Sequence, residues 1–196
     1  MTRILLLRHG QSVWNAAGRW QGRADPPLSP LGREQARVAI DSLDHVDAVF
    51  SSDLVRARET AEILATEHEV QFEPRLRERD GGEWTGLTRP EIEAQWPGYL
   101  ADGRRPEGFE EDEQVIERAR GAIARITAEV PDGIVIVVSH GGLVRAVERH
   151  LGLEDGGPVP NLGGRWISVE GDALVAGERQ LLIDPDAVEV TAPGLL

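Results

Sequence analysis

The sequence predicts an α/β fold with three layers, in which helices cover both faces of a mainly parallel sheet. Segments with the apolar character of buried strands alternate along the chain with segments of helical periodicity, and this alternation is typical of parallel β-α-β units. The chain has 196 residues, enough to bury a sizeable core, so we expect a single domain over residues 1–196. In such sheets, ligands bind at the carboxyl ends of the strands.

The first half of the chain supplies three strands and two helices. Strands are predicted at residues 3–7, 47–52 and 70–74, where short apolar runs occur. Helices are predicted at residues 29–43 and 53–68. Ser29 and Asp53 are the expected N-caps, because a side-chain oxygen there can accept a free N–H of the first turn. Pro30 suits the first helical position.

The second half contains an irregular segment, two helices, a strand and a hairpin. The irregular segment is rich in glycine and proline and predicts a lid or side excursion at about residues 75–111, with one short helix at 89–97. Helical periodicity follows at residues 112–130 and 143–152, and residues 134–138 form a continuous apolar run. A late β-hairpin is predicted over residues 164–184, with its turn at Gly171 and Asp172.

The composition excludes several kinds of chemistry. The chain has no cysteine, and all 21 of its basic residues are arginine. Disulfides, cysteine-ligated zinc and a cysteine nucleophile are therefore excluded, as are a Schiff-base lysine and the lysine of a P-loop. The net charge of −13 argues against nucleic acid or an anionic membrane as a partner. An anionic substrate would need a local cluster of arginines.

The apolar segments also bear on location. The longest runs, such as residues 134–138, are too short to cross a bilayer. The first run is not followed by a small-residue cleavage site of the kind that ends a signal peptide. We therefore expect a cytoplasmic protein.

Charged side chains lie at or just beyond the ends of three predicted strands. Arg8 and His9 come directly after the first strand, and His140 comes just after the run at residues 134–138. Arg56 lies in the first turn of a helix, where N–H groups and the helix dipole favour anions. Each of these residues alone has a plainer explanation, as a structural histidine or the arginine of a surface ion pair. Because the strand ends meet at one edge, they together predict a phosphate site that contains a nucleophile.

Five blocks of the sequence resemble the histidine phosphatase, or phosphoglycerate-mutase-like, superfamily, in the order in which that family shows them. The blocks are LLLRHGQSVWN, GRWQGRADPPLSPLGREQA, SSDLVRARETA, LRERDGGEWTGLT and VVSHGGLVRA. The signature RHG would be a weak signal by itself, whereas five ordered blocks across residues 1–152 are specific. The resemblance implies a phosphoglycerate-mutase-like fold.

The resemblance also implies a role for each matching residue. His9 matches the nucleophile that becomes phosphohistidine, and Glu78 matches the general acid. Arg8 and Arg56 match the arginines that grip the phosphoryl oxygens. The second histidine of the site and the remaining residues of the phosphate pocket are matched by His140, Asn15, Gln21, Gly22 and Gly141. No metal or cofactor is implied, because the arginines supply the positive charge.

Some features leave alternatives open. The family often has an aromatic residue three positions after the glutamate, and this chain has Gly81 there, which could loosen the loop that carries Glu78. Arg104 and Arg105 could meet a second anionic group of the substrate or form a solvated surface pair. The same choice between a substrate cleft and core packing applies to Trp14, Trp20, Trp84 and Trp96.

The leading expectation is a metal-independent phosphomonoester hydrolase that acts through a phosphohistidine intermediate on a small phosphorylated metabolite. A cofactor-dependent phosphoglycerate mutase is the alternative, although such mutases resemble longer chains and Gln21 resembles the phosphatase branch. A non-catalytic binder of phosphometabolites is a minor alternative, and it should have lost Arg8, His9 or His140. An α/β-hydrolase would need a G-x-S-x-G elbow, which the chain lacks. The sequence leaves open the substrate and a possible homodimer.

Overall fold

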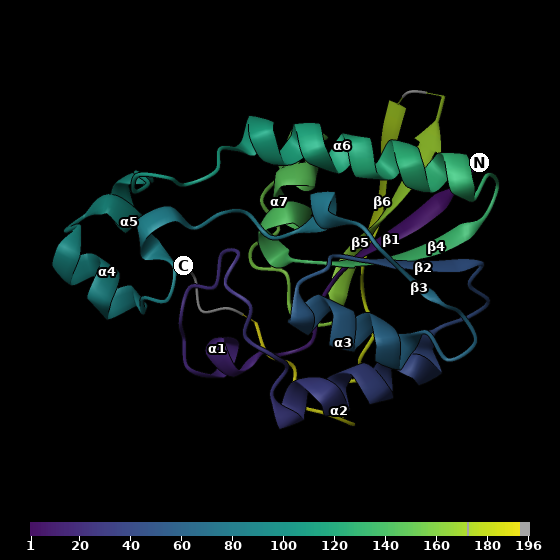
Figure 1. Ribbon diagram of the computed structural model, residues 1–196, viewed down its shortest axis with the longest axis horizontal. Helices are drawn as coiled ribbons and strands as arrows, with labels where there is room; N and C mark the ends of the chain where they lie inside the picture. The colour runs from purple at the N-terminus through teal and green to yellow at the C-terminus, as the bar shows by residue number, and fades with distance from the viewer. Residues whose placement is uncertain (172, 193–196) are drawn as a thin grey trace.

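A six-stranded sheet forms the centre of the protein in the computed structural model, which describes residues 1–171 and 173–192 (Figure 1). The strand order is β3-β2-β4-β1-β5-β6. The first four of these strands are parallel, and β5 and β6 are antiparallel to their neighbours. The sheet is therefore mainly parallel, as predicted. Its strands are β1 (Arg3–Arg8), β2 (Ala48–Ser51), β3 (Val70–Phe72), β4 (Ile134–Ser139), β5 (Gly163–Glu170) and β6 (Ala173–Leu181).

Helices cover both faces of the sheet and complete the three layers (Figure 1). Successive strand residues point to opposite faces. Ile4 and Leu6 of β1 belong to the core under α6 and α7, whereas Leu5 and Leu7 belong to the core over α2 and α3. The four helices are α2 (Pro30–Ala39), α3 (Val55–Leu64), α6 (Asp112–Glu129) and α7 (Gly141–His150).

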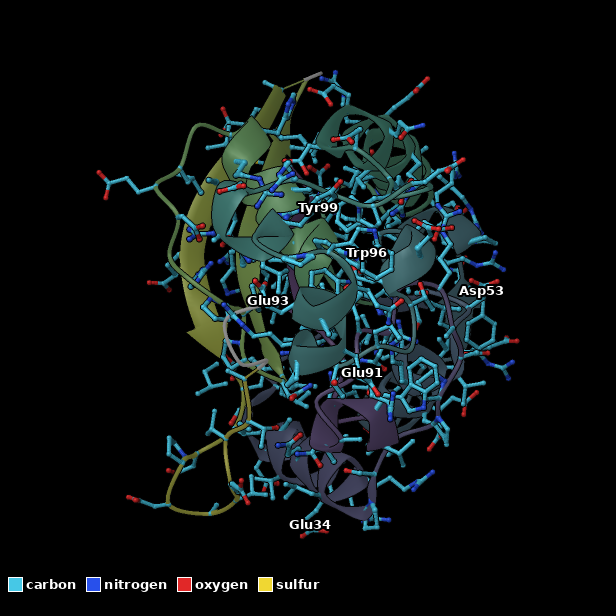
Figure 2. The ribbon with its side chains drawn as sticks, turned by 90° about the vertical axis from the view of Figure 1, so that its left-hand side faces the viewer. Glu34, Asp53, Glu91, Glu93, Trp96 and Tyr99 are labelled. Carbon is cyan, nitrogen blue, oxygen red and sulfur yellow. The ribbon has the colours of Figure 1, made fainter. Side chains whose placement is uncertain are left out.

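The predicted excursion is a string of short elements between β3 and α6. It contains 3-10 turns at Pro74–Leu76 and Gly82–Trp84, and the helices α4 (Arg89–Gln95) and α5 (Tyr99–Asp102). Figure 1 shows α4 and α5 away from the sheet, on the side to which β1 and β4 point their carboxyl ends. Figure 2 looks onto this excursion, with Glu91, Glu93, Trp96 and Tyr99 toward the viewer. The short helix α1 (Val13–Ala16) was not predicted.

The prediction for the N-terminus of α2 is confirmed, and that for α3 is wrong. The Ser29 hydroxyl accepts the N–H of Gly32 at 3.0 Å, and α2 begins at Pro30. By contrast, α3 begins at Val55 with no cap from Asp53, because Arg77 binds both carboxylate oxygens of Asp53. Bidentate pairs with arginine are among the strongest hydrogen-bonded contacts of a carboxylate.

Asp25, from a distant loop, supplies the side-chain acceptor that was predicted to come from Asp53. Its carboxylate accepts the N–H of Val55 at 2.6 Å. The helix ends at Leu64 rather than at residue 68. A contact between residues thirty positions apart is invisible to a rule that reads only local sequence.

Two further boundaries differ from the prediction. Helix α7 begins at Gly141, with His140 as its N-cap residue, so the glycines after His140 are helical. The hairpin β5–β6 spans Gly163–Leu181. Of its predicted turn, Gly171 adopts a φ of 61°, where glycine is unstrained, and Asp172 lies outside the described residues. In the part of the chain that the structure describes, no helix is long and apolar enough to cross a membrane.

Removing a core side chain of α6 should destabilise the fold markedly. Ile126 is fully buried at 0% exposure, so Ile126→Ala leaves a cavity and should lower the free energy of unfolding by about 2–5 kcal/mol. Urea denaturation measures this change. The control is Val175→Ala on the edge strand β6, where the side chain is 41% exposed and the loss should stay below about 0.5 kcal/mol. Equal losses in the two variants would contradict the assignment of the core.

Candidate active site

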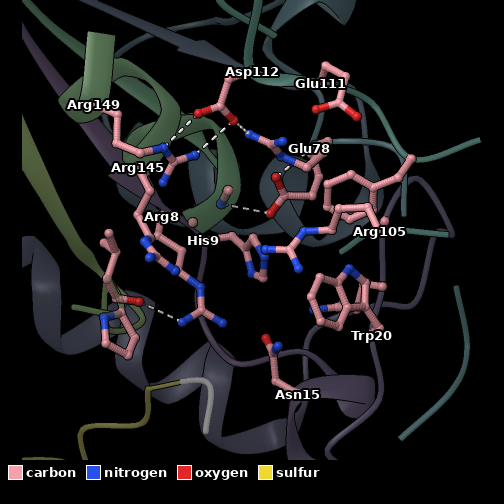
Figure 3. A pocket seen from close by; sticks show the side chains of 18 of the residues that line it. Arg8, His9, Asn15, Trp20, Glu78, Arg105, Glu111, Asp112, Arg145 and Arg149 are labelled. Atoms are coloured by element: carbon pink, nitrogen blue, oxygen red, sulfur yellow. Dashed lines mark hydrogen bonds and ion pairs between the residues drawn. The ribbon is translucent and has the colours of Figure 1, made fainter. Parts of the chain in front are cut away.

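A cavity of about 420 Å³ lies where the ends of β1 and β4 face the excursion (Figure 3). Nine residues were expected at the site from sequence, and the structure brings all of them together. Seven line the cavity: Arg8, His9, Asn15, Gln21, Gly22, Glu78 and Gly141. Arg56 and His140 lie beside His9, with an Arg56–His9 hydrogen bond of 3.1 Å and a distance of 5.1 Å between the two imidazole centroids.

The His9 ring is held by one hydrogen bond on each nitrogen. Its Nδ1 lies 2.6 Å from the carbonyl oxygen of Gly10, and a carbonyl can only accept, so Nδ1 carries the proton. Its Nε2 is therefore unprotonated, and the lone pair on Nε2 accepts from Nε of Arg56 at 3.1 Å. Burial, followed by the charges of Arg56 and Arg8, lowers the pKa of His9 well below 6.5. The ring is neutral at physiological pH, with Nε2 available as a nucleophile.

Two buried guanidinium groups flank this ring, and main-chain carbonyls fix both. Arg8 donates to the carbonyl of Val159 at 2.7 Å. Arg56 donates to the carbonyls of Ala24 and Gly22 at 2.7 and 2.9 Å. Burial lowers the pKa of each arginine to about 10, so both stay charged at neutral pH. Fixed cations beside a nucleophile suit an anionic electrophile such as a phosphoryl group.

His140 offers a further donor to the same place. Its Nε2 lies 2.9 Å from the Ser52 hydroxyl, which also accepts the N–H of Leu54 at 3.3 Å. If the hydroxyl donates to Nε2, the proton of His140 lies on Nδ1. That Nδ1 is buried and has no hydrogen-bond partner among the described residues. Burial, followed by the charge of Arg56, lowers the pKa of His140 well below 6.5, so the ring is neutral, and a proton on Nδ1 makes it a donor beside His9.

Glu78 faces these groups from the excursion (Figure 3). Its half-buried carboxylate accepts the N–H of Arg79 at 2.7 Å and the N–H of Gly142, in the first turn of α7, at 3.1 Å. The cavity therefore has a carboxyl group at its side, which can donate or accept a proton. Ser12 caps α1, and Oδ1 of Asn15 accepts the Ser12 N–H at 3.1 Å in return. Gln21 accepts from the Ser12 hydroxyl at 2.6 Å.

Comparisons with known proteins agree with this geometry. The family model for the histidine phosphatase superfamily (branch 1) matches residues 4–162. The chain belongs to this superfamily. It is 38% identical over 166 residues to a glucosyl-3-phosphoglycerate phosphatase of Mycobacterium tuberculosis, covering 76% of this chain and 74% of the relative. It is 36% identical over 160 residues to a metal-independent phosphoserine phosphatase of Arabidopsis thaliana, covering 75% and 67%.

A solved structure and a mutase relative complete the comparison. The structure of a mycobacterial glucosyl-3-phosphoglycerate phosphatase with VO3 superposes with a TM-score of 0.81 at 34% identity, covering 89% of this chain and 96% of that one. A probable phosphoglycerate mutase of Photorhabdus laumondii is 37% identical over 180 residues, covering 79% of this chain and 82% of the relative. The named relatives thus include phosphatases and mutases with the same scaffold.

This superfamily member packs its Glu78 loop without an aromatic residue at position 81. Three rings from neighbouring positions, Trp20, Trp84 and Phe109, meet edge to face with centroids 5.2 to 6.2 Å apart. A Cβ atom on Gly81 would lie 3.1 Å from the Trp20 ring, so the space beside residue 81 is already filled. Aromatic contacts therefore occupy the space that a side chain at position 81 would fill.

The arginine pair at residues 104 and 105 and the tryptophans each include residues in different surroundings. Arg105 lines the cavity and lies over the rings of Trp84 and Phe109, whereas the exposed Arg104 pairs with Asp102 at 2.6 Å. Of the tryptophans, Trp20 lines the cavity and Trp84 is fully buried. One member of each set therefore lines the cavity, and another does not.

Sequence reasoning missed Asn161 and the contribution of the loop before β5. The buried Asn161 side chain donates to the carbonyl of His9 at 2.8 Å, and Val159 of the same loop holds Arg8. This loop lies about 150 residues from His9 in the chain, and its sequence carries no local pattern that marks it. Within residues 1–171 and 173–192, no group of three or more histidine, aspartate or glutamate side chains could hold a metal ion.

The buried neutral histidines should make stability depend on pH. The unfolded chain binds protons on these histidines below about pH 6.5, and the folded chain does not, because burial lowers both pKa values. The free energy of unfolding should therefore fall as pH decreases below 6.5, by up to about 1.4 kcal/mol per pH unit for each histidine.

Denaturation between pH 7 and 5.5 tests this linkage. His140→Asn should flatten the dependence of the unfolding free energy on pH. The matched control is His150→Asn at the exposed end of α7, and the change of slope in the first variant should exceed that in the second. Parallel slopes in all three proteins would show that His140 titrates alike in the folded and unfolded chains.

Proposed function

We propose that the protein is a metal-independent phosphomonoester hydrolase that forms a phosphohistidine at His9 and acts on a small phosphorylated metabolite. The observation that carries the proposal is the state of His9: a buried, neutral ring with its proton held on Nδ1 by Gly10 and its unprotonated Nε2 accepting from Arg56. The phosphatase names of the relatives support the same reaction class.

In the first step, Nε2 of His9 attacks phosphorus. The N–P bond forms while the bond from phosphorus to the ester oxygen breaks, and Glu78 donates a proton to the departing alcohol. Arg8, Arg56 and Nδ1 of His140 stabilise the charge on the phosphoryl oxygens. Asn15 and Gln21 bind the phosphoryl group from the cavity wall. Gly22 and Gly141 leave room there for the substrate.

In the second step, water replaces the histidine. The Glu78 carboxylate takes a proton from water, the water oxygen attacks phosphorus, and the N–P bond breaks to return neutral His9 and release phosphate. Dividing the reaction at a covalent intermediate replaces one difficult step with two easier ones. The arginines provide the positive charge that a metal ion supplies in other phosphoryl-transfer enzymes.

The mutase alternative uses the same groups, and the mutase relative keeps it open for experiment. A non-catalytic binder is disfavoured, because Arg8, His9 and His140 are all present and converge. Within the single domain we propose, residues 75–111 act as a lid. Glu78, Arg105 and Phe109 of this segment line the cavity. A cytoplasmic location fits a small-metabolite substrate, and the homodimer stays a prediction.

Release of inorganic phosphate in the presence of EDTA tests the proposed reaction. We expect turnover of p-nitrophenyl phosphate and of some members of a phosphometabolite panel, because no metal takes part. His9→Ala should abolish it, with a loss of at least about 10³-fold, and His150→Ala, at an exposed position, should retain it. Failure of the wild type on every substrate would reject the phosphatase. 3-Phosphoglycerate with 2,3-bisphosphoglycerate would then test the mutase.

Glu78→Gln tests the proposed acid. The variant cannot protonate a leaving group, so kcat for glycerol phosphate should fall by about 10²- to 10⁴-fold. The fall for p-nitrophenyl phosphate should be much smaller when phosphorylation limits turnover, since p-nitrophenolate leaves readily without a proton. Glu83→Gln, at an exposed position of the same loop, is the control. Equal losses for both substrates would assign Glu78 a role other than protonation of the leaving group.

A further inference from the structure

The nucleophile belongs to a short main-chain segment, residues 9–11, whose two peptide planes are each held at both ends. In the His9–Gly10 plane, the carbonyl of His9 accepts from Asn161 at 2.8 Å, and the N–H of Gly10 donates to Thr60 at 3.1 Å. In the Gly10–Gln11 plane, the N–H of Gln11 donates to Oε1 of Gln35 at 2.9 Å. The carbonyl of this second plane is the one that accepts from Nδ1 of His9.

The second plane connects Gln35 to the protonation of His9. A trans peptide is rigid and planar, and its C=O and N–H point in opposite directions. The contact that holds the Gln11 N–H therefore also directs the Gly10 carbonyl toward Nδ1. A neutral histidine carries its proton on the ring nitrogen that faces an acceptor and not on the one that faces a donor. In His9, Nδ1 faces the Gly10 carbonyl and Nε2 faces the donating Arg56. Gln35 thus acts on the tautomer of His9 through one peptide plane.

The Gln35 side chain is itself oriented by a directional series of hydrogen bonds. Its Nε2 donates to Thr191 Oγ1 at 3.1 Å, and the Thr191 hydroxyl donates to Oδ1 of Asn161 at 2.8 Å. The Asn161 amide then donates to the carbonyl of His9. The series begins at the N–H of Gln11 and ends at the carbonyl of His9, so it returns to the segment that it holds. Exchanging O and N in the Gln35 amide would place two donors against each other, and exchanging them in the Asn161 amide would place two acceptors against each other.

Helix α2 places Gln35 in this position. The carbonyl and the side chain of Gln11 accept from the main-chain N–H and the hydroxyl of Ser29 at 2.8 and 2.7 Å. A Cβ atom on Gly32 would overlap the carbonyl of Gln11, so only glycine lets the helix approach so closely. Gln35 follows one turn later and has 0% exposure. The sequence block SPLGREQA therefore packs helix α2 against Gln11.

We propose that Gln35, Thr191 and Asn161 are positioning residues that keep His9 in its Nδ1-protonated tautomer by holding the Gly10 carbonyl. None of the three lines the cavity, so they act through the main chain and not on the substrate. The kinetic consequence rests on the proposed function. When Nε2 bonds to phosphorus, the ring becomes cationic with its proton still on Nδ1, and the Gly10 carbonyl then accepts a stronger, charge-assisted hydrogen bond.

Three variants test the network. Thr191→Val removes the hydroxyl at nearly constant shape, Thr191→Ser keeps it, and Gln35→Met removes the acceptor for the Gln11 N–H. Thr127→Val is the matched control, because Thr127 is a part-buried residue of α6 whose hydroxyl donates to helix carbonyls away from the site. Thermal denaturation confirms that each variant is folded.

The primary readout is ¹⁵N NMR of histidine-labelled protein at neutral pH, with His9→Ala to assign the signals. We expect a single Nδ1-protonated form of His9 in the wild type, Thr191→Ser and Thr127→Val. A mixture of tautomers should appear in Thr191→Val and Gln35→Met. This measurement needs no turnover, so it tests the positioning role even if the proposed function is wrong.

The secondary readout is the rate of phosphoenzyme formation with p-nitrophenyl phosphate. It should fall by about tenfold or more in Gln35→Met and by less in Thr191→Val, with KM little changed, because the reacting nitrogen is misplaced while substrate contacts remain. A folded Gln35→Met with the wild-type tautomer and rate would overturn the proposal. If Gln35→Met does not fold, identical tautomers and rates in Thr191→Val and Thr191→Ser would overturn it.

Discussion

The site depends on two arginine side chains that are buried without a carboxylate partner. Arg8 and Arg56 are 4% and 0% exposed, and among the described residues neither forms an ion pair, although Glu78 lies near enough to favour their charged forms. Burying a charge costs several kcal/mol unless other groups offset it. Carbonyls of Val159, Ala24 and Gly22 provide that compensation only in part. The fold thereby keeps unneutralised positive charge in place for an anion, a local cost of the kind that functional sites often carry.

The same charge determines the behaviour of the two histidines. Each imidazole is buried next to a guanidinium, and burial and the neighbouring charge both disfavour a second cation. His9 is therefore available as a nucleophile without first losing a proton, and His140 can donate without adding charge. Their hydrogen-bond partners differ, a main-chain carbonyl for His9 and the Ser52 hydroxyl for His140, and this difference separates the proposed roles of two chemically identical side chains.

The acidic surface of the protein is compatible with this basic site. The net charge is −13, yet six arginines line the cavity with only three carboxylates, Glu78, Glu111 and Asp112. Asp112 alone holds both Arg79 and Arg149. The net negative charge of the protein repels an anion, and the local excess of arginines at the cavity offsets that repulsion.

Local sequence patterns were enough to predict the fold class, the order of strands and helices along most of the chain, and the residues at the carboxyl ends of β1 and β4. These properties depend on periodicity over neighbouring residues, and Arg8, His9 and His140 follow directly because a strand end is a local feature. The five blocks of family resemblance added Glu78, Asn15 and Gln21, for which periodicity offers no signal.

Contacts between distant segments of the chain became visible only in the folded structure. Asp25 rather than Asp53 accepts the first N–H of α3, Trp20 fills the space beside Gly81, and Arg105 rather than Arg104 reaches the cavity. Gln35, Asn161 and Thr191 come from three separate parts of the chain to hold one segment around His9. A side-chain hydrogen bond needs its two atoms within about 3 Å, and which distant residues come that close is settled by the packing of the layers, which no local pattern encodes.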